Sequence, residues 1–353
     1  MELIGNQGIT TQLSLMSQAS AYSDRPLPHM LLSGSPGCGK TSTAKYISSK
    51  MGSRFFSVVP EAIKTRDDVL RIIEMFDRKT GYDREGNRLK DIRISYPILF
   101  IDEIHRMPIT GQEHLGIVME EWQIPIEQKR MRVSIYDKLN LRTDRYRWCP
   151  LFTLIGATTN DGLLSKPFKD RFKAKFIFST YTLEESIKIV LVHNDRLNAA
   201  NTFTKVNIDH GGAMEIAKRG RGTPRILVTL LERCRDLALA KKIDTITTEV
   251  SIAMFAILNI DGCGLTETDI KILKLLFNSN DPIGIDNLAV ITNESKQAIS
   301  DTVEPYLIQQ ELISRTGRGR ALTDKGKEYL VSNGHIEDKQ DYVDIPYNYN
   351  RRL

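Results

Sequence analysis

Two rhythms of apolar and polar residues divide this chain. Up to about residue 180, short apolar runs that suit buried strands alternate with amphipathic stretches typical of helices. The apolar runs are 29–33, 96–101 and 151–155, and the amphipathic stretches are 41–50 and 67–78. Because parallel strands need long crossover connections, usually helices, this alternation predicts an α/β domain with a helix-covered parallel sheet. A polar stretch at 80–93, which contains two glycines, predicts an exposed loop or hairpin.

From residue 181 the strand signal disappears. Thr182 and Glu185 have the spacing of a capping box, in which each side chain satisfies a free amide at the start of a helix. The pattern then stays helical to about residue 260, with breaks at 207–212 and 220–224. This segment predicts a small helical bundle.

A third pattern follows residue 261. It contains a helix, a short helix, a longer helix, a glycine-containing pair of strands and a final short helix, which is the order of a winged helix. These elements are expected at 266–276, 286–290, 295–310, 312–322 and 324–330. Residues 336–353 are polar and aromatic, and we expect them to have no structure of their own. The expected organisation is therefore 1–180, 181–260 and 261–335, followed by a tail at 336–353.

Composition narrows the class of protein. With 353 residues, 41% hydrophobic and 26% charged, the chain resembles a soluble globular protein with a sizeable core. Its apolar runs are too short to cross a bilayer, and its first residues lack the basic and apolar regions of a signal peptide. The four cysteines are far apart, which predicts neither a zinc site nor a disulfide framework. We expect a cytoplasmic protein without a membrane partner.

A phosphate-binding motif follows the first predicted strand. The sequence Gly34-Ser-Pro-Gly-Cys-Gly-Lys-Thr41 fits G-x-x-x-x-G-K-[ST] and leads directly into a helical stretch. Its glycines let successive amide hydrogens turn toward phosphates, and the following helix adds its positive end. Lys40 is expected at the β and γ phosphates, and the Thr41 hydroxyl at Mg²⁺. The residues expected to hold ATP here are Gly34, Gly37, Cys38, Gly39, Lys40, Thr41 and Ser42.

Two carboxylates follow a second predicted strand. Ile98-Leu-Phe-Ile runs directly into Asp102 and Glu103. We expect Asp102 to hold the water shell of Mg²⁺, and Glu103 to orient and deprotonate the attacking water. This pair favours hydrolysis of ATP over transfer of its phosphoryl group to a bound acceptor, and so argues against a small-molecule kinase.

Three further residues are candidates for the same reaction. Thr159 ends a third predicted strand, where its hydroxyl could position the water or the γ phosphate. Arg171 and Arg225 lie on separate elements, and a guanidinium stabilises charge on a transferring phosphoryl group. One arginine acting within the subunit and one reaching a neighbour would account for both.

Basic residues form two clusters, although the net charge is only +5. The segment 126–149 has seven basic residues against three acidic ones, interleaved with tyrosine and tryptophan. Arg315, Arg318 and Arg320 form the second cluster, on the expected wing. Each cluster suits contact with DNA phosphates, and each is also compatible with a merely solvated face.

Together these motifs resemble those of the RuvB family, the Holliday-junction branch-migration motors of the AAA+ class. The matching stretches are SGSPGCGKT, ILFIDEIHRM, FTLIGATTNDGLLSKPFKDRF, RGRGTPRILVTLLERCRD and VEPYLIQQELISRTGRGRALT. The resemblance runs from residue 3 to about residue 330. It implies an AAA+ ATPase domain, a helical lid and a winged helix, assembled as a hexameric ring around duplex DNA.

The resemblance also implies roles for individual residues. Thr159 matches sensor 1, Arg171 the arginine finger that acts on a neighbour, and Arg225 sensor 2. Other matching positions are Glu120, Glu121 and Trp122, an acidic-aromatic triplet near ATP; Tyr181, beside the nucleotide; and Arg315 and Arg320, which contact DNA.

Several stretches depart from the family pattern. The N-terminus lacks the Arg-Pro-x-x-Leu segment of the adenine pocket, and Lys169 stands where the family has arginine. In the family an apolar hairpin docks on the RuvA partner, whereas the corresponding segment 126–149 is longer and basic here. We therefore expect it to bind DNA or an acidic partner, which leaves the need for RuvA open. The insertion at 80–93 and the tail suggest a divergent version of the family, such as a phage-encoded one.

The leading hypothesis is an ATP-driven DNA motor for branch migration in recombination and repair. Two alternatives share the same motifs. One is a clamp-loader or initiator-like AAA+ switch that remodels a protein. The other is a winged-helix DNA-binding regulator whose ATPase controls assembly.

Overall fold

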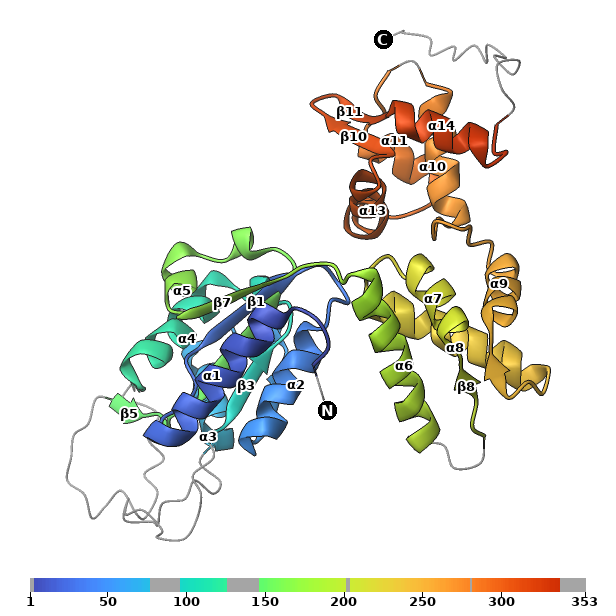
Figure 1. Cartoon of the computed structure of the whole chain (residues 1–353). Coiled ribbons are helices and arrows are strands. Elements are labelled where there is room, and N and C mark those ends of the chain that lie inside the picture. Colours follow the sequence, from blue (N-terminus) through green and yellow to red (C-terminus); the bar gives the residue numbers. More distant parts are fainter. Residues whose placement is uncertain (1–2, 77–95, 126–145, 201–203, 280, 337–353) are drawn as a thin grey trace, which may run out of the picture. The chain divides into compact units, whose positions relative to one another are not determined.

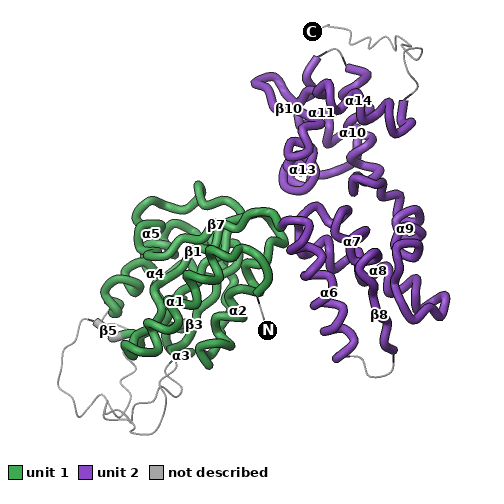
Figure 2. The backbone as a smooth tube through the Cα atoms, in the orientation of Figure 1, with its two compact units in different colours: residues 1–181 green, residues 182–353 purple. Residues whose placement is uncertain are grey.

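The computed structural model describes residues 3–76, 96–125, 146–200, 204–279 and 281–336. These residues belong to two compact units, Met1–Tyr181 and Thr182–Leu353 (Figure 2). The expected loop at 80–93, most of the basic segment 126–149 and the tail lie outside the described residues. No described helix is long and apolar enough to cross a membrane.

The first unit is built on a five-stranded parallel sheet with the order β2-β3-β6-β1-β7. Its strands β1, β3 and β7 are labelled in Figure 1. Its strands are β1 (Met30–Gly34), β2 (Phe55–Val58), β3 (Ile98–Ile101), β6 (Thr153–Thr158) and β7 (Ala174–Phe178). The strands expected at 29–33, 96–101 and 151–155 correspond to β1, β3 and β6. The predicted α/β class, with a parallel sheet, is confirmed.

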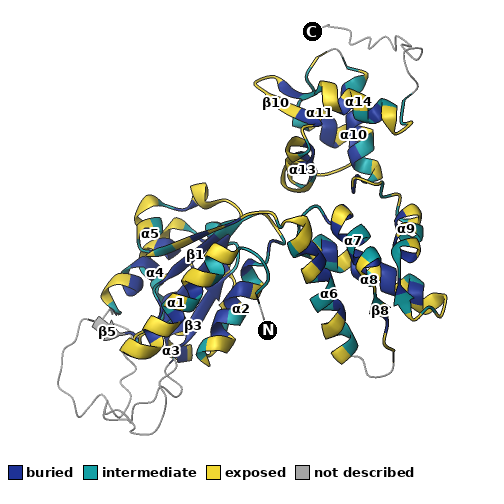
Figure 3. Ribbon diagram, in the orientation of Figure 1, coloured by how far each residue is buried: buried dark blue, intermediate teal, exposed yellow. Residues whose placement is uncertain are grey.

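Alternating side chains of the strands divide the core between the two faces of the sheet. Met30 and Leu32 of β1 pack with one cluster, whereas Leu31 between them packs with the other. One face is covered by α1 (Gln7–Ser23) and α2 (Lys40–Met51), and the other by α3 (Arg66–Phe76) and α4 (Ile109–Glu121) (Figure 3). The helix α1 was not predicted, because serine, threonine and glutamine dominate it.

Short elements complete the first unit. They are η1 (Pro60–Ala62), η2 (Ile104–Arg106), η4 (Asp161–Leu163) and α5 (Lys166–Asp170), and the antiparallel strands β4 (Gln123–Pro125) and β5 (Tyr146–Trp148). Because β4 and β5 pair, the basic segment begins and ends at one antiparallel ladder. In a parallel sheet the carboxyl ends of the strands share one edge, so the loops after β1, β3 and β6 lie together there.

The second unit begins with four helices around their own core. They are α6 (Leu183–Ala200), α7 (His210–Arg219), α8 (Pro224–Ala240) and α9 (Thr248–Ile257), with a short parallel pair formed by β8 (Asn207–Ile208) and β9 (Thr245–Ile246). The predicted capping box is present before α6: the Thr182 amide donates to Glu185 Oε2 at 2.9 Å, and the Glu185 amide donates to Thr182 Oγ1 at 3.2 Å.

The remainder of the second unit is a winged helix with a core cluster of its own. Its elements are α10 (Glu267–Phe277), α11 (Ile285–Thr292), α12 (Lys296–Ala298), a π-helical turn (Ile299–Val303), α13 (Glu304–Gln309), β10 (Ile313–Thr316), β11 (Gly319–Leu322) and α14 (Asp324–Ser332). The helix expected at 295–310 is divided, because Pro305 has no amide hydrogen for the α-helical ladder. The chain passes through the π-helical turn just before it.

Candidate nucleotide site and DNA-binding wing

The loop after β1 has the backbone of a phosphate cradle. Gly34, Gly37 and Gly39 have φ values of 153°, 78° and 98°, which side-chain-bearing residues rarely adopt. A Cβ at Gly34 would also lie 2.8 Å from the Phe178 carbonyl oxygen of β7. The glycine spacing seen in the sequence therefore serves both the curl of the loop and its close approach to β7.

Lys40 closes this loop from the first turn of α2. Its Nζ donates to the carbonyl oxygens of Gly34 and Ser35 at 2.6 and 2.9 Å, and its side chain is buried. A triphosphate would offer Lys40 charged oxygens in place of these carbonyls, which makes stronger hydrogen bonds. Ser42 lies in the same first turn, where its amide adds to the positive end of α2.

The Cys38 side chain is a packing group within the loop. It is buried, and burial raises the pKa of its thiol above the ordinary value. Its carbonyl oxygen accepts a hydrogen bond of 3.1 Å from the hydroxyl of Tyr181, the last residue of the first unit. Tyr181 therefore lies at the phosphate loop, which agrees with the position beside the nucleotide that the family resemblance implied for it.

Thr41 and Asp102 meet across the edge of the sheet. The Thr41 hydroxyl donates to Asp102 Oδ2 at 3.2 Å. Among the described residues, no cluster of three or more His, Cys, Asp or Glu side chains could hold a metal by itself. One hydroxyl and one carboxylate suit Mg²⁺, which keeps several waters and takes its other ligands from phosphates.

Glu103 follows Asp102 with a strained backbone, since its φ is 47°. Its Oε2 accepts hydrogen bonds from the Thr159 hydroxyl at 2.9 Å and the Thr159 amide at 3.3 Å. His105 Nδ1 lies 3.2 Å from the same oxygen and 2.9 Å from Thr158 Oγ1. The structure thus brings Glu103 and Thr159 together, as their positions after β3 and β6 predict.

His105 and Thr158 were not among the residues singled out from the sequence. Their role depends on the contact between η2 and the end of β6, which pairs residues far apart along the chain. The only sequence signal was a histidine two residues after Glu103. Together these two side chains restrict the orientation of Glu103.

Arg171 lies at the other end of the first unit. It lines a hollow together with residues 25–29, the segment that leads into β1, whereas the phosphate loop starts where β1 ends. The stretch from His29 to Gly34 spans roughly 16 Å of extended strand. Arg171 is therefore remote from the phosphate loop of its own subunit, which suits the expected action on a neighbour.

Two residues of the acidic-aromatic triplet, Glu120 and Trp122, line the same hollow at the end of α4. Glu120 Oε2 is 3.1 Å from Arg171 Nε in an ion pair, and Trp122 packs against the rings of His29 and Phe152. The resemblance implied that Glu120, Glu121 and Trp122 lie near ATP, and the structure places them away from the phosphate loop of their own chain. Their α4 terminus is on the side of Arg171, so a nucleotide near them would belong to another subunit.

His29 fastens the amino end of β1. Its Nδ1 accepts from the Leu154 amide at 2.9 Å, so the ring proton is on Nε2, which lies 3.2 Å from the Met119 carbonyl oxygen. Burial is the main cause that lowers the pKa of His29 from 6.5 to about 4. The neutral ring is thus the form that this site accommodates.

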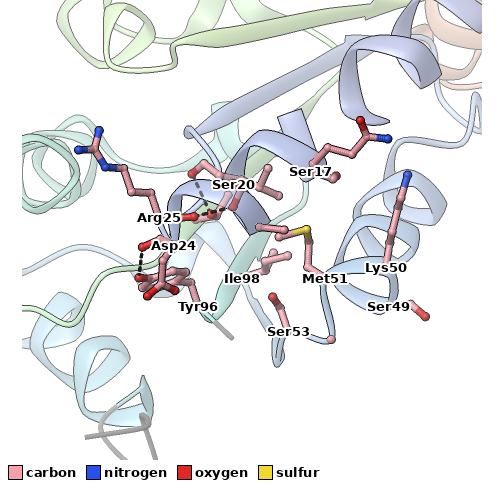
Figure 4. Close-up of a pocket in the computed structure, with 15 residues that line it drawn as sticks. Ser17, Ser20, Asp24, Arg25, Ser49, Lys50, Met51, Ser53, Tyr96 and Ile98 are labelled. Atoms are coloured by element: carbon pink, nitrogen blue, oxygen red, sulfur yellow. Dashed lines mark hydrogen bonds between the residues drawn. The ribbon is translucent and has the colours of Figure 1, made fainter. Parts of the chain in front are cut away.

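A second, polar hollow lies at the opposite edge of the sheet from the phosphate loop (Figure 4). It is lined by the ends of α1 and α2 and by the starts of β3 and β6, including Ile98 and Thr153. The Tyr96 hydroxyl donates to the Asp24 carbonyl oxygen there at 2.7 Å. None of the expected nucleotide-binding residues line this hollow, so it is separate from the phosphate site.

In the second unit, Arg225 is exposed in the first turn of α8. The turn begins at Pro224, whose fixed φ suits the first position of a helix. A guanidinium at this place can extend from the start of α8 without breaking a contact within the bundle.

The three arginines of the wing differ in exposure: Arg320 is buried, whereas Arg315 and Arg318 are exposed. Arg315 and Arg320 are direct neighbours across β10 and β11, so their side chains share one face. Arg320 Nη2 lies 2.6 Å from Glu304 Oε2, and its side chain is only 9% exposed. Arg315 is 69% exposed, with Nε 3.9 Å from Glu304 Oε1, and Arg318 is exposed in the turn between the strands.

This burial corrects the expectation that Arg320 contacts DNA. Its guanidinium is committed to a buried carboxylate, and its backbone exchanges two hydrogen bonds with Ile283. Gly319 permits that approach, because a Cβ there would lie 2.5 Å from the Ile283 carbonyl. Arg320 therefore fastens the wing to the body of the winged helix, and Arg315 and Arg318 remain available to phosphates.

Comparisons with known proteins agree with this architecture. Residues 30–180 match the model of the ATPase family associated with various cellular activities, 194–261 match the RuvB AAA lid domain, and 262–331 match the RuvB C-terminal winged helix domain.

Whole-chain relatives extend the match. The Holliday junction branch migration complex subunit RuvB of Ehrlichia ruminantium (strain Gardel) is 35% identical over 93% of this chain and 90% of its own length. That of Rickettsia africae is 35% identical over 93% of this chain and 87% of its own. The Thermotoga maritima RuvB Holliday junction branch migration motor superposes with a TM-score of 0.72 at 31% identity, covering 93% of this chain and 95% of that one. This chain therefore belongs to the RuvB family.

Proposed function

We propose that this protein is an ATP-dependent DNA motor that drives branch migration of Holliday junctions, as a ring of identical subunits that is hexameric in the family. The observation that carries the proposal is that one chain contains both a phosphate loop with a nearby carboxylate pair and a winged helix whose wing presents exposed arginines. Glu103 is fixed by Thr159 and His105, and the wing presents Arg315 and Arg318.

Each residue of the site has a step in this proposal. Lys40 and the loop amides would bind the triphosphate of ATP, and Thr41 and Asp102 would hold Mg²⁺, which would supply positive charge beside the phosphates. Glu103 accepts a proton from the attacking water. Thr159 can exchange its hydrogen bond to Glu103 for one to the γ phosphate, which frees the carboxylate for that water.

Arg171 completes the site from the adjacent subunit. Its own phosphate loop is at the far end of β1, and its guanidinium is held by a carboxylate that a phosphate can replace. In the second unit, Arg225 would contact the γ phosphate and lose that contact after hydrolysis, so that the helical lid could change its position. The wing would hold the duplex through its phosphates, and such contacts position DNA without reading its sequence.

Branch migration of a synthetic four-way junction tests this function. The purified protein, with ATP, should separate the junction into its duplex products, and Glu103→Gln protein should not. The assay is run with the protein alone and with an added RuvA-type protein, because the basic segment 126–149 replaces an apolar docking hairpin. Activity alone would support loading through that segment, and strict dependence on RuvA would contradict it.

The same assay separates the alternatives. Hydrolysis of ATP without junction migration, with or without RuvA, would overturn the motor and favour a clamp-loader or initiator-like switch. Slow turnover that DNA does not change would favour a winged-helix regulator. We place the activity in the cytoplasm.

A further inference from the structure

One arginine joins the helical bundle of the second unit to its winged helix. Arg221 lies in the turn between α7 and α8, with a left-handed φ of 53°. Its Nε and Nη2 donate to the Gly264 carbonyl oxygen at 2.9 and 2.7 Å, and Nη2 also forms an ion pair with Asp269. Its guanidinium carbon lies 4.5 Å from the centroid of the Tyr306 ring. A single side chain therefore contacts both α10 and α13.

The winged-helix side of this contact is equally fixed. Asp269 is fully buried, and its Oδ2 also accepts from the Thr266 amide and hydroxyl in the capping box of α10, at 2.7 and 2.6 Å. The Tyr306 hydroxyl donates to the Cys263 carbonyl oxygen at 2.5 Å. Gly264 has a φ of 76° and packs so closely that a Cβ would lie 2.8 Å from the Arg219 carbonyl oxygen. The linker at 261–265 is thus locked against the turn that carries Arg221.

That turn is continuous with the start of α8. The Thr223 amide donates to the Gly220 carbonyl oxygen at 2.9 Å, and the Leu227 amide donates to the Thr223 carbonyl oxygen at 3.1 Å. Arg225 is exposed on the first turn of α8, four residues after Arg221. A shift of this turn moves the Arg221 guanidinium, and with it the buried Asp269, because a close-packed core transmits displacement.

We propose that Arg221 is a positioning residue that couples Arg225 to the DNA-binding wing. Through Arg221, binding of nucleotide at Arg225 changes the affinity of the winged helix for DNA, and binding of DNA changes the affinity for nucleotide. The inference rests on the proposed function, since it assigns the route between two sites of the same motor. Such coupling is reciprocal, so ATP changes affinity for DNA by the same factor by which DNA changes affinity for ATP.

The test compares the unaltered protein with Arg221→Met, which keeps the apolar stem against Tyr306 and removes the donors. Affinity for a fluorescent duplex is measured with no nucleotide and with a non-hydrolysable ATP analogue, and ATP turnover is measured with and without DNA. Arg233→Met is the matched control, because Arg233 is exposed on α8 and pairs only with Asp236 of the same helix among the described residues.

We expect Arg221→Met to keep the basal turnover and the nucleotide-free affinity for DNA. Its ratio of DNA affinities with and without analogue should fall at least fivefold toward one, the low end of typical allosteric coupling. Its stimulation by DNA should fall in parallel. Arg221→Lys, which retains the charge, should recover part of the ratio, and Arg233→Met should match the unaltered protein.

The variant Asp269→Asn tests the same ion pair by changing the residue that binds Arg221. It should reduce the ratio like Arg221→Met, and the double variant should lose no more than either single one, because both remove one interaction. An unchanged ratio in folded Arg221→Met protein would overturn the inference and leave the motor intact. Equal losses of basal turnover and DNA affinity, with the ratio preserved, would mean a purely structural role and would also overturn it. If the unaltered protein showed no coupling at all, the proposed function and this inference would fail together.

Discussion

The burial of Arg320 makes a quantitative prediction about DNA binding by the wing. Binding that neutralises phosphates releases counterions, so the logarithm of affinity falls with the logarithm of salt by about 0.9 for each contact. Arg315→Ala combined with Arg318→Ala removes two exposed guanidinium groups. In this double variant the plot of log affinity against log salt should be less steep by about 1.8. Between 50 and 200 mM salt, the variant should therefore lose roughly tenfold less affinity for DNA than the unaltered protein loses.

Arg320 should behave differently, because its guanidinium is paired inside the winged helix. Removing Arg320 alone leaves Glu304 buried without its partner, which costs about 3–5 kcal/mol of stability. Replacing both partners, as Arg320→Met with Glu304→Leu, avoids that cost, and such exchanges of buried ion pairs are often close to neutral. This pair variant should keep the salt slope of the unaltered protein.

Fluorescence anisotropy of a labelled duplex over a salt series measures the slope, and thermal unfolding checks that each variant is folded. Arg233→Ala in α8 controls for the loss of an exposed positive charge outside the wing. A folded Arg320→Met/Glu304→Leu protein whose slope is about 0.9 lower would refute the assignment of Arg320 as a fastening residue. An unchanged slope in the Arg315→Ala/Arg318→Ala protein would reassign the wing to protein docking.

Three further predictions concern the ATPase domain. Glu103→Gln should bind ATP normally but turn it over at a negligible rate, because the proton acceptor is lost while Thr41 and Asp102 remain; near-normal steady-state hydrolysis would contradict this. Arg171→Ala should lower the rate of ATP hydrolysis by about 10³ or more. Mixing Arg171→Ala with Lys40→Ala protein should restore some hydrolysis, and mixtures no more active than the separate variants would mean that Arg171 does not act on a neighbouring subunit. Between pH 6.5 and pH 4, His29 should lower the free energy of unfolding by about 3 kcal/mol, because the unfolded chain binds a proton that the folded chain excludes. Urea titrations of His29→Gln protein should lack this loss, and the same pH dependence in both proteins would refute the prediction.

Those parts of the site that are encoded locally could be predicted from the sequence. The phosphate loop depends on glycine spacing between a strand and a helix, and Asp102 and Glu103 depend on the end of an apolar strand. Parallel strands bring their carboxyl ends to one edge, so the sequence placed Glu103 and Thr159 at the same edge of the sheet. Their contact also requires β3 and β6 to be neighbouring strands, which the sequence did not specify. The winged helix was recognisable from the order of its elements, whereas the segment before it was predicted only as a helical bundle and was identified as a lid through the family resemblance.

What could not be predicted depends on which residues meet in three dimensions. The ion pair of Arg171 with Glu120 depends on the packing of α5 against α4. The burial of Arg320 depends on the register of the wing and on a glutamate sixteen residues away. In the sequence, Arg315 and Arg320 look alike, since both are long basic side chains near a glycine-containing turn. The structure distinguishes them, because Arg320 is buried in an ion pair with Glu304 whereas Arg315 is 69% exposed.

The placement of Arg171 and the phosphate loop at opposite ends of β1 gives each subunit a polarity. Identical subunits that join the Arg171 end of one to the loop end of the next form a heterologous, head-to-tail interface, which closes only as a ring. If Arg171 acts on a neighbour as proposed, every hydrolytic centre would be shared by two chains, and a solitary chain would contain half of each of two different centres. Replacing Arg171 in one subunit of such a ring would then inactivate the adjacent subunit's centre and leave the phosphate loop of its own chain competent. Activity should accordingly fall more steeply than protein concentration when the assembly is diluted.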